Sequence, residues 1–357
     1  MPSAARIALD AFGGDHCPQP EVAGAVAAAR HGVRILLVGD EAKLARVLAE
    51  HDASRLPIEI RHAPDVITMR DEAAKAVRSK PNASMPVCFD LVKSGEADAA
   101  MSAGNSGAML ACGLFKYRRI KGVDRPALVT SLPTRTGDRT VLLDIGANVE
   151  CRPINLVQFA VMGAVYAGFK HGKTTPRVGL LSNGAESSKG TELTRSVHAL
   201  LSAYDAAHTM SYAGYVEADA LLSGEVDVVV TDGFTGNIAL KLAEATGRLV
   251  GGWLKDSVME GGLVGKLGGL LMREAFGDLR ARLDPDSYGA APLLGVKGVA
   301  FICHGGASAA AIGRSLTLAA RSVDEELMPK LSAALTHAAP LFAEAKAAGR
   351  PGAKASD

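Results

Sequence analysis

The sequence predicts an α/β protein whose mainly parallel sheet is flanked by helices. Short apolar runs alternate with longer segments rich in alanine and leucine at helical spacing, and this alternation is typical of parallel strands joined by helices. Most runs are apolar without interruption, which indicates strands covered on both faces. Most runs also end in a glycine-containing turn, and open α/β sheets bind their ligands beyond the carboxyl ends of strands.

The runs expected to be strands are, in chain order, Ile7–Leu9, Ile35–Val38, Ile58–Ile60, Ala97–Met101, Ala127–Thr130, Val141–Ile145, Val178–Leu181, Val226–Thr231 and Val299–Cys303. The turns that follow them include AFGGD, SAGNSG, DIGANV, SNGAES, TDGFTG and CHGGAS. We therefore expect the functional site to lie among these turns.

Two segments repeat one pattern. Gly95–Gly107 reads GEADAAMSAGNSG and Gly224–Gly236 reads GEVDVVVTDGFTG, and both follow G-E-x-D-x-x-x-[ST]-x-G-x-[ST]-G without a gap. Two strand–turn–helix units built alike predict two related lobes facing one cleft. Chance similarity between low-complexity segments is the alternative.

The length also favours two lobes, because 357 residues correspond to about two domains of roughly 150 residues each. We expect one catalytic unit over residues 1–343, with an insertion at about 250–283 where GGLVGKLGGLLM breaks the α/β rhythm. The tail at 344–357 is rich in alanine, glycine, lysine and proline, and it is expected to be disordered.

Charge and aromatic content argue against a nucleic-acid partner. The chain has 39 Lys and Arg against 38 Asp and Glu, a net charge of +1, and only 4% aromatic residues. A polyanion would need a basic field, and single strands would need stacking platforms. No nucleic acid is therefore expected among the partners.

Cysteine usage and missing motifs indicate a cytoplasmic protein without metal or cofactor. The five cysteines are far apart and form no C-x-x-C, which is typical of reduced thiols. Neither G-x-G-x-x-G nor G-x-x-x-x-G-K-[ST] nor a zincin histidine pair occurs. No signal peptide and no window of 18 apolar residues is found.

Three turns have the composition of anion-binding loops. In such turns successive backbone N–H groups, backed by a helix dipole, converge on one spot. The predicted binding residues are Gly13, Gly14 and Asp15 in the first turn, Ser102, Gly104, Asn105, Ser106 and Gly107 in the second, and Asp232, Gly233, Thr235 and Gly236 in the third. The alternative is that these turns only cap helices, since serine, asparagine and glycine are common caps.

One cation stands out near these turns. Lys189 lies in a polar loop between an apolar run and a helical segment, NGAESSKGTE. An ammonium group in that place can neutralise phosphate or a developing oxyanion. A lysine that is simply solvated is the alternative.

The turns together resemble a known family. ALDAFGGDH, SAGNSGAMLA, GVDRPAL, LLDIGANV, VGLLSNGAESSKGTELT, VVVTDGFTGNIALK and YGAAPLLGVKG are similar, in this order from Ile7 to about Arg321, to the bacterial phosphate acyltransferase (PlsX) family. The departures are Phe12, where the family has methionine, Ala290 in place of a glycine, and Gly306-Ala307-Ser308 in the late motif. These departures put any role of the residues around His304 in doubt.

The resemblance implies a fold like isopropylmalate dehydrogenase and phosphotransacetylase, with two lobes around a cleft, a helical hairpin and a homodimer. It implies an acyltransferase of phospholipid synthesis that converts long-chain acyl-ACP and inorganic phosphate to acyl phosphate and free acyl carrier protein. The functional lysine and asparagine of the family fall on Lys189 and Asn237.

This chemistry agrees with the absence of a catalytic triad motif. A thioester is already electrophilic, so the protein has to hold phosphate, aim it at the carbonyl and stabilise the oxyanion. We expect direct attack without a covalent enzyme intermediate, with phosphate at Ser102–Gly107 and with Lys189 and Asn237 on phosphate or the oxyanion. The alternatives are a phosphotransacetylase that uses a short acyl-CoA, a decarboxylating dehydrogenase, and a phosphate-binding regulator.

The resemblance also implies that the hairpin contacts the inner face of an anionic membrane. The expected contact residues are Leu263, Leu267, Leu270 and Leu271. Charges between residues 253 and 282 sum to only +1, so electrostatic attraction adds little. A core or dimer-interface role is the alternative. For the acidic carrier, Arg118, Arg119 and Lys121 are one candidate docking patch, with a solvated helix end as the alternative.

Overall fold

The computed structural model describes residues 5–204, 209–283 and 289–349. The first part of the chain forms β1 (Arg6–Asp10), α1 (Gln19–Arg30), β2 (Arg34–Gly39), α2 (Glu41–Leu48), β3 (Ile58–His62), α3 (Ala73–Ser79), α4 (Ser84–Ser94), β4 (Ala99–Ser102), α5 (Ser106–Cys112) and the π-helical turn η1 (Gly113–Tyr117). The middle forms β5 (Ala127–Pro133), β6 (Arg139–Leu143), α6 (Pro153–His171), β7 (Arg177–Leu181), α7 (Glu192–Ala203), β8 (Ser211–Val216), α8 (Ala220–Ser223) and β9 (Val228–Val230). The remainder forms α9 (Gly233–Glu260), α10 (Gly262–Leu271), α11 (Arg273–Leu283), β10 (Ala291–Leu294), β11 (Val299–Ile302), α12 (Ala309–Asp324), α13 (Leu327–His337) and α14 (Ala339–Ala348).

The strands form one sheet in the order β3-β2-β1-β4-β11-β10-β5-β6-β9-β7-β8. All nine runs expected to be strands are strands, so the predicted α/β class and mainly parallel sheet are confirmed. The sequence missed β8 and β10. Strand β8 lies at the edge of the sheet, is only partly buried and contains a glycine, while β10 has four residues including a proline.

The sheet consists of two parallel blocks. Strands β3, β2, β1, β4 and β11 share one direction, and β6, β9, β7 and β8 share another. The three antiparallel pairs between the blocks make their directions opposite. Sheet twist, at about 20–25° for each neighbouring pair, turns the blocks through roughly 100–125° between β4 and β9. In a flat sheet the carboxyl ends of the two blocks would lie at opposite edges. The twist removes this constraint.

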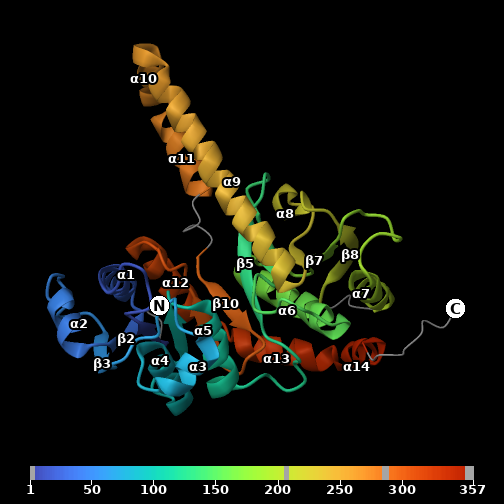
Figure 1. Ribbon diagram of the computed structural model, residues 1–357, viewed down its shortest axis with the longest axis horizontal. Helices are drawn as coiled ribbons and strands as arrows, with labels where there is room; N and C mark the ends of the chain where they lie inside the picture. The colour runs from blue at the N-terminus through green and yellow to red at the C-terminus, as the bar shows by residue number, and fades with distance from the viewer. Residues whose placement is uncertain (1–4, 205–208, 284–288, 350–357) are drawn as a thin grey trace.

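Helices cover both faces of each block (Figure 1). The first block packs against α1, α2 and α12 on one face and against α3, α4 and α5 on the other. Helix α6, nearly all of which is buried, lies between the second block and helices α13 and α14. Each lobe thus has its own apolar core, as two related lobes require.

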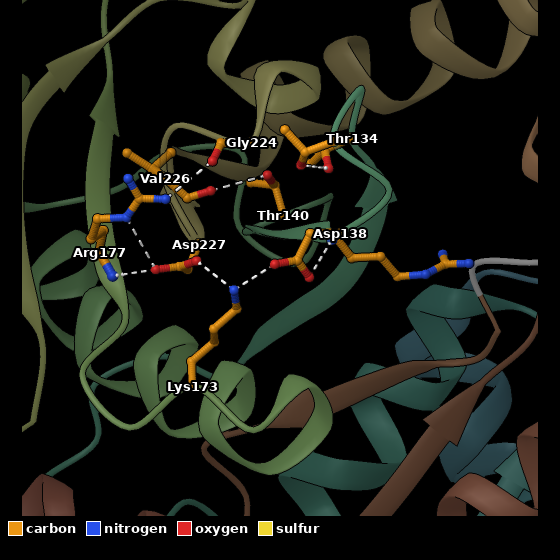
Figure 2. A network of polar contacts seen from close by, with 10 residues as sticks. Thr134, Asp138, Thr140, Lys173, Arg177, Gly224, Val226 and Asp227 are labelled. Carbon is orange, nitrogen blue, oxygen red and sulfur yellow. Dashed lines mark hydrogen bonds and ion pairs between the residues drawn. The ribbon is translucent and has the colours of Figure 1, made fainter.

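The repeated segments are structurally equivalent. Asp98 and Asp227 each accept the backbone N–H of an arginine that begins a neighbouring strand, Arg6 or Arg177, at 2.8 Å in both lobes. The same two guanidinium groups donate to the carbonyls of glycines that end α4 and α8 in the left-handed region. Figure 2 shows the second-lobe copy, in which Lys173 and Arg177 both pair with Asp227. The repeat reflects shared architecture rather than chance composition.

Helices α9, α10 and α11 form an arm that projects from the body, with α10 at its far end (Figure 1). The expected hairpin starts earlier than the predicted boundary near residue 250, since α9 is one helix of 28 residues from Gly233. Its continuity is explained by the helix-forming residues between Ile238 and Arg248. None of the described helices is long and apolar enough to cross a membrane.

The predicted disordered tail begins too early. Helix α14 continues to Ala348, because Phe342 and Ala345 are buried against the core of the second lobe. The expectation was therefore wrong for residues 344–348. Residues 350–357 lie outside the described part of the chain.

Candidate functional site

The first two predicted turns pack against each other where β1 and β4 end. An ideal Cβ on Gly13 would lie 2.7 Å from Ser102 Oγ and 2.8 Å from the Gly104 nitrogen, and one on Gly104 would lie 3.2 Å from Gly13 Cα. Only glycine fits at these contacts without displacement. The structure therefore brings Gly13, Gly14 and Asp15 together with the Ser102–Gly107 turn, as the parallel pairing of β1 and β4 requires.

A buried hydrogen-bond chain holds this junction. Ser102 Oγ donates to Asp10 Oδ2 at 2.6 Å and accepts the N–H of Gly104 at 2.9 Å. Asp10 also accepts the N–H of Phe12. Burial raises the pKa of the Asp10 carboxyl, and the Ser102 hydrogen bond lowers it. Ser102, which is 1% exposed, thus positions the turn, and its hydroxyl is not directed to a ligand.

Asn105 also has a structural task. Its side chain caps α5 by accepting the N–H of Ala108, and its amide donates to the carbonyls of Thr68 and Asp71. The first N–H groups of a helix have no intrahelical acceptor, and no hydrogen bond in the described part of the chain uses those of Ser106 and Gly107. These two residues are exposed and are the groups of this turn that can bind an anion.

Glu21, in the first turn of α1, packs against Gly14. An ideal Cβ on Gly14 would lie 2.2 Å from Glu21 Oε1, and the carboxylate is 2% exposed. Its Oε2 is buried without a hydrogen-bond partner. Burial, with a smaller contribution from the nearby Asp10 and Asp15, raises the pKa of Glu21 to about 7, while hydrogen bonds from the backbone lower it. This buried carboxylate was not predicted from the sequence, because an acidic residue in the first turn of a helix is ordinary.

The pKa of Glu21 predicts a change in stability with pH. Between about pH 4.5 and 7 the folded chain keeps a proton that the unfolded chain has lost, so the free energy of unfolding falls as pH rises through this range. Glu21→Gln removes this contribution. Urea unfolding at pH 5.5 and pH 8 is expected to show the wild type losing on the order of 2 kcal/mol relative to the variant. Parallel pH profiles for the two proteins would contradict the assignment.

The third predicted turn, Thr231–Asn237, begins helix α9. Asp232 caps the helix by accepting the N–H and the hydroxyl of Thr235, both at 2.8 Å. The N–H of Gly233 donates to the Asn148 carbonyl at 2.7 Å. Asp232, Gly233 and Thr235 are therefore engaged in the cap, and the capping interpretation holds for their polar groups.

The DIGANV loop, residues 144–149, packs against this turn. Asp144 Oδ1 accepts N–H groups of Leu128, Gly146 and Ala147, and Oδ2 accepts the N–H and the amide of Asn148. Burial raises the pKa of Asp144, and these donors lower it. The carboxylate thus fixes the loop on which the start of α9 rests.

Asn237 lies beside this loop. Its side chain is exposed, and its Oδ1 is 3.8 Å from an ideal Cβ on Gly146, whose φ is +136°. Ile145 and Ala147 of the same loop pack against the apolar cluster that contains α5 residues of the first lobe. The DIGANV loop therefore contacts the start of α9 on one side and the first-lobe core on the other, which links the two sets of turns.

In the described part of the chain, Lys189 is not connected by a polar contact to either set of turns. It is exposed, and its loop closes through the Gly190 N–H donating to Asn183 Oδ1 at 2.9 Å. The Lys189 stem folds over Gly184, with Cγ 2.8 Å from an ideal Cβ there. Within residues 5–204, 209–283 and 289–349 no hydrogen bond or ion pair of the ammonium joins it to either turn. The same loop follows β7 as the GGD turn follows β1, so it is the second-lobe counterpart of the first turn.

No group of three or more His, Cys, Asp and Glu side chains suited to a metal ion occurs in the described residues. The five cysteines are free thiols. Two surface hollows of about 640 and 410 Å³, beside β8 and beside α13, include none of the predicted site residues.

Comparisons with known proteins agree with this geometry. Residues 5–330 match the model of a family described as fatty acid synthesis protein. The phosphate acyltransferase of Geobacter sulfurreducens is 48% identical over 93% of this chain and 95% of its own length. That of Pelobacter propionicus is 50% identical over 92% and 94%.

Solved structures similar to this chain share its fold. The EutD phosphotransacetylase from Staphylococcus aureus is similar with a TM-score of 0.57 at 18% identity, over 89% of this chain and 94% of that one. A branched-chain phosphotransacylase from Enterococcus faecalis V583 has a TM-score of 0.54 at 14% identity, over 89% and 99%. The predicted phosphotransacetylase-like architecture is confirmed, and the likeness to isopropylmalate dehydrogenase stays a prediction.

Proposed function

Because the chain belongs to the phosphate acyltransferase family and is an acyltransferase, we propose that it moves a long acyl chain from acyl carrier protein to inorganic phosphate. A phosphate oxygen attacks the thioester carbonyl, the C–O bond forms, and the C–S bond breaks. The carrier thiolate leaves and takes the phosphate proton. The products are acyl phosphate and free carrier, which supply phospholipid synthesis.

The observation that carries this proposal is the junction of glycine turns at the ends of β1 and β4. Gly13 and Gly104 approach so closely that no side chain fits, and the exposed N–H groups of Ser106 and Gly107 lie directly after it. Backbone amides at a helix start bind anions without a large positive field. A net charge of +1 fits this kind of local capture.

Lys189 and Asn237 are proposed to complete the site from the second lobe. Asn237 is held by α9 beside the DIGANV loop, which also contacts the first lobe. Lys189 is an exposed cation on a loop at a strand end, and closing this loop toward the junction would place its charge on phosphate or on the tetrahedral oxyanion. Direct attack needs no covalent enzyme intermediate, because phosphate itself is the nucleophile.

The reaction class is tested by offering each donor separately. Purified protein is incubated with long-chain acyl carrier protein, with acetyl-CoA or with NAD, each with and without phosphate, and the products are identified. Acyl phosphate and free carrier are expected only when acyl carrier protein and phosphate are both present. Formation of acetyl phosphate from acetyl-CoA would favour the alternative function, a phosphotransacetylase. Release of the carrier without phosphate would contradict direct attack.

The arm is proposed to bring the enzyme to the inner face of an anionic membrane, from the cytoplasm. At its tip Leu263, Leu267, Leu270 and Leu271 are between 60% and 88% exposed. Helix α10 has ten residues, about 15 Å, which is half of the hydrocarbon core. It therefore suits insertion along the interface rather than across the bilayer.

An apolar stripe on α9 supports a homodimer. Phe234, Ile238, Leu242, Leu249 and Trp253 recur at spacings of four and seven residues and are between 50% and 65% exposed. Such spacing places them on one face, and a face this apolar is unusual for a helix left in water. The matching face of a second copy would cover it.

Leu267→Glu with Leu271→Glu is expected to abolish binding to vesicles of anionic lipid, because two charges would have to enter the apolar boundary. Co-sedimentation with liposomes measures this, and gel filtration checks that the oligomeric state is kept. Leu222→Glu, at an exposed leucine of α8, is the matched control and should bind like the wild type. Undiminished binding of the double variant would rule out the tip as the contact.

A further inference from the structure

Several exposed cations and one exposed aromatic ring lie on neighbouring segments of the first lobe. We call the surface formed by Lys75, Arg78, Phe115, Arg118, Arg119, Lys121 and Lys297 the basic face. The Arg78 guanidinium lies 4.7 Å from the centroid of the Phe115 ring. The carbonyl of Arg118 accepts the backbone N–H of Lys297, and Arg119 forms an isolated antiparallel β-bridge with Val296. Three segments that are distant in sequence therefore meet in one continuous surface.

The acids beside the basic face are already neutralised by other cations. Asp90 pairs with Lys116 at 2.7 Å, Asp124 pairs with Arg152 at 2.7 Å, and Asp71 pairs with Lys80 at 2.8 Å. Glu72, the N-cap residue of α3 one turn before Lys75, and Asp15 of the first turn are exposed acids nearby. In a chain whose net charge is +1, the six cations of the basic face still form a local excess of positive charge.

The basic face also offers an apolar contact. Phe115 is 42% exposed, and Met69, on the loop before α3, is 48% exposed. A large apolar group enclosed by charged residues is typical of the centre and rim of a protein–protein interface. A basic surface that is simply solvated would not need an apolar group at its centre.

The basic face adjoins the candidate site directly. Helix α3 packs on α5, and an ideal Cβ on Gly107 would lie 2.9 Å from Ala73 Cβ. The turn η1, which carries Phe115, continues α5 at the end opposite to Ser106 and Gly107. Nine residues separate Ser106 from Phe115, about 14 Å at helical rise. Met69 lies beside the candidate site, with its Cε 2.9 Å from an ideal Cβ on Gly305, whose carbonyl accepts the N–H of Asp15.

From this arrangement we propose that the basic face is the docking surface for the acidic carrier protein that delivers the acyl thioester. This inference rests on the proposed function. The cations match the acidic surface of the carrier, Phe115 supplies the apolar centre, and the thiol arm reaches along α5 to Ser106 and Gly107. Charge complementarity of this kind mainly sets encounter rate and partner choice.

The test reverses charge on the basic face and measures kinetics with palmitoyl carrier protein. The triple variant Arg78→Glu, Arg118→Glu, Arg119→Glu is expected to raise KM for the acyl carrier about tenfold or more. Its KM for phosphate, measured at saturating acyl carrier, should stay within about twofold of the wild type. Phe115→Ala should raise KM for the acyl carrier in the same way without a change of charge.

The matched control reverses three exposed cations far from this surface, Arg30→Glu, Arg46→Glu and Lys330→Glu, and should leave both constants unchanged. An equal rise in KM for the carrier in the control would show a field effect and overturn the docking surface. An unchanged KM in the basic-face variant, or a loss of vesicle binding alone, would overturn it as well. If the wild type itself forms no acyl phosphate, the proposed function fails instead, which keeps the two failures apart.

Discussion

Replacing Lys189 or Asn237 with alanine is expected to lower the rate of acyl phosphate formation about 10²–10³-fold. Both side chains are exposed on loops or helix starts at strand ends of the second lobe, and neither supports the fold through the hydrogen bonds that hold Asp144 or Ser102. The loss should therefore appear in catalysis with little change in the thermal unfolding midpoint.

The kinetic constants separate the two roles that each side chain can take. A group that binds phosphate in the ground state raises KM for phosphate when it is removed. A group that stabilises only the tetrahedral oxyanion lowers kcat and leaves KM unchanged. Lys189→Arg should recover part of the rate, because the charge is kept.

Lys330→Ala and Asn82→Ala are matched controls, since both residues are exposed and belong to none of the glycine turns. They should retain wild-type constants. Activity within a few-fold of wild type in both Lys189→Ala and Asn237→Ala would remove these residues from the mechanism.

Gly236→Ala is expected to have the second largest effect. An ideal Cβ at Gly236 would lie 2.0 Å from the Asp144 carbonyl oxygen and 3.1 Å from Thr231 Cγ2. The carbonyl cannot retreat easily, because the Asp144 carboxylate holds the DIGANV loop through five hydrogen bonds. The start of α9 must move instead, and Asn237 moves with it.

Overpacking of this kind destabilises by about 1–3 kcal/mol, and a displacement of about 1 Å at a reacting group can cost 10²-fold in rate. Thermal unfolding and acyl phosphate formation measure the two effects. Gly251→Ala on the same helix is the matched control, because in the described part of the chain no atom beyond its own helix turn lies within 4 Å of its ideal Cβ. The control should be fully active and more stable by about 0.5–1 kcal/mol. Full activity of Gly236→Ala would contradict the proposed role of the α9 start.

The sequence allowed the sheet and the positions of the turns to be predicted, because buried strands are read from apolar runs and turns from glycine. It did not reveal the reversal of direction between the two blocks, which depends on the pairing of β10, β5 and β6. Strand pairing is a tertiary property, and short runs carry no sign of their partner.

The sequence predicted which turns come together but not what their single polar groups do. Ser102 and Asn105 were expected to bind an anion, and the structure uses their side chains to hold Gly104 and to cap α5. Asp232 and Thr235 cap α9 in the same way. Composition shows which donors a turn contains, but only the geometry shows which donors remain free.

The central claim is that turns from both lobes hold one phosphate. The most direct measurement is a crystal structure with phosphate bound. The account predicts phosphate against the N–H groups of Ser106 and Gly107, with the Asn237 amide or the Lys189 ammonium in hydrogen-bond contact. Phosphate bound elsewhere, with these four groups out of its reach, would contradict it.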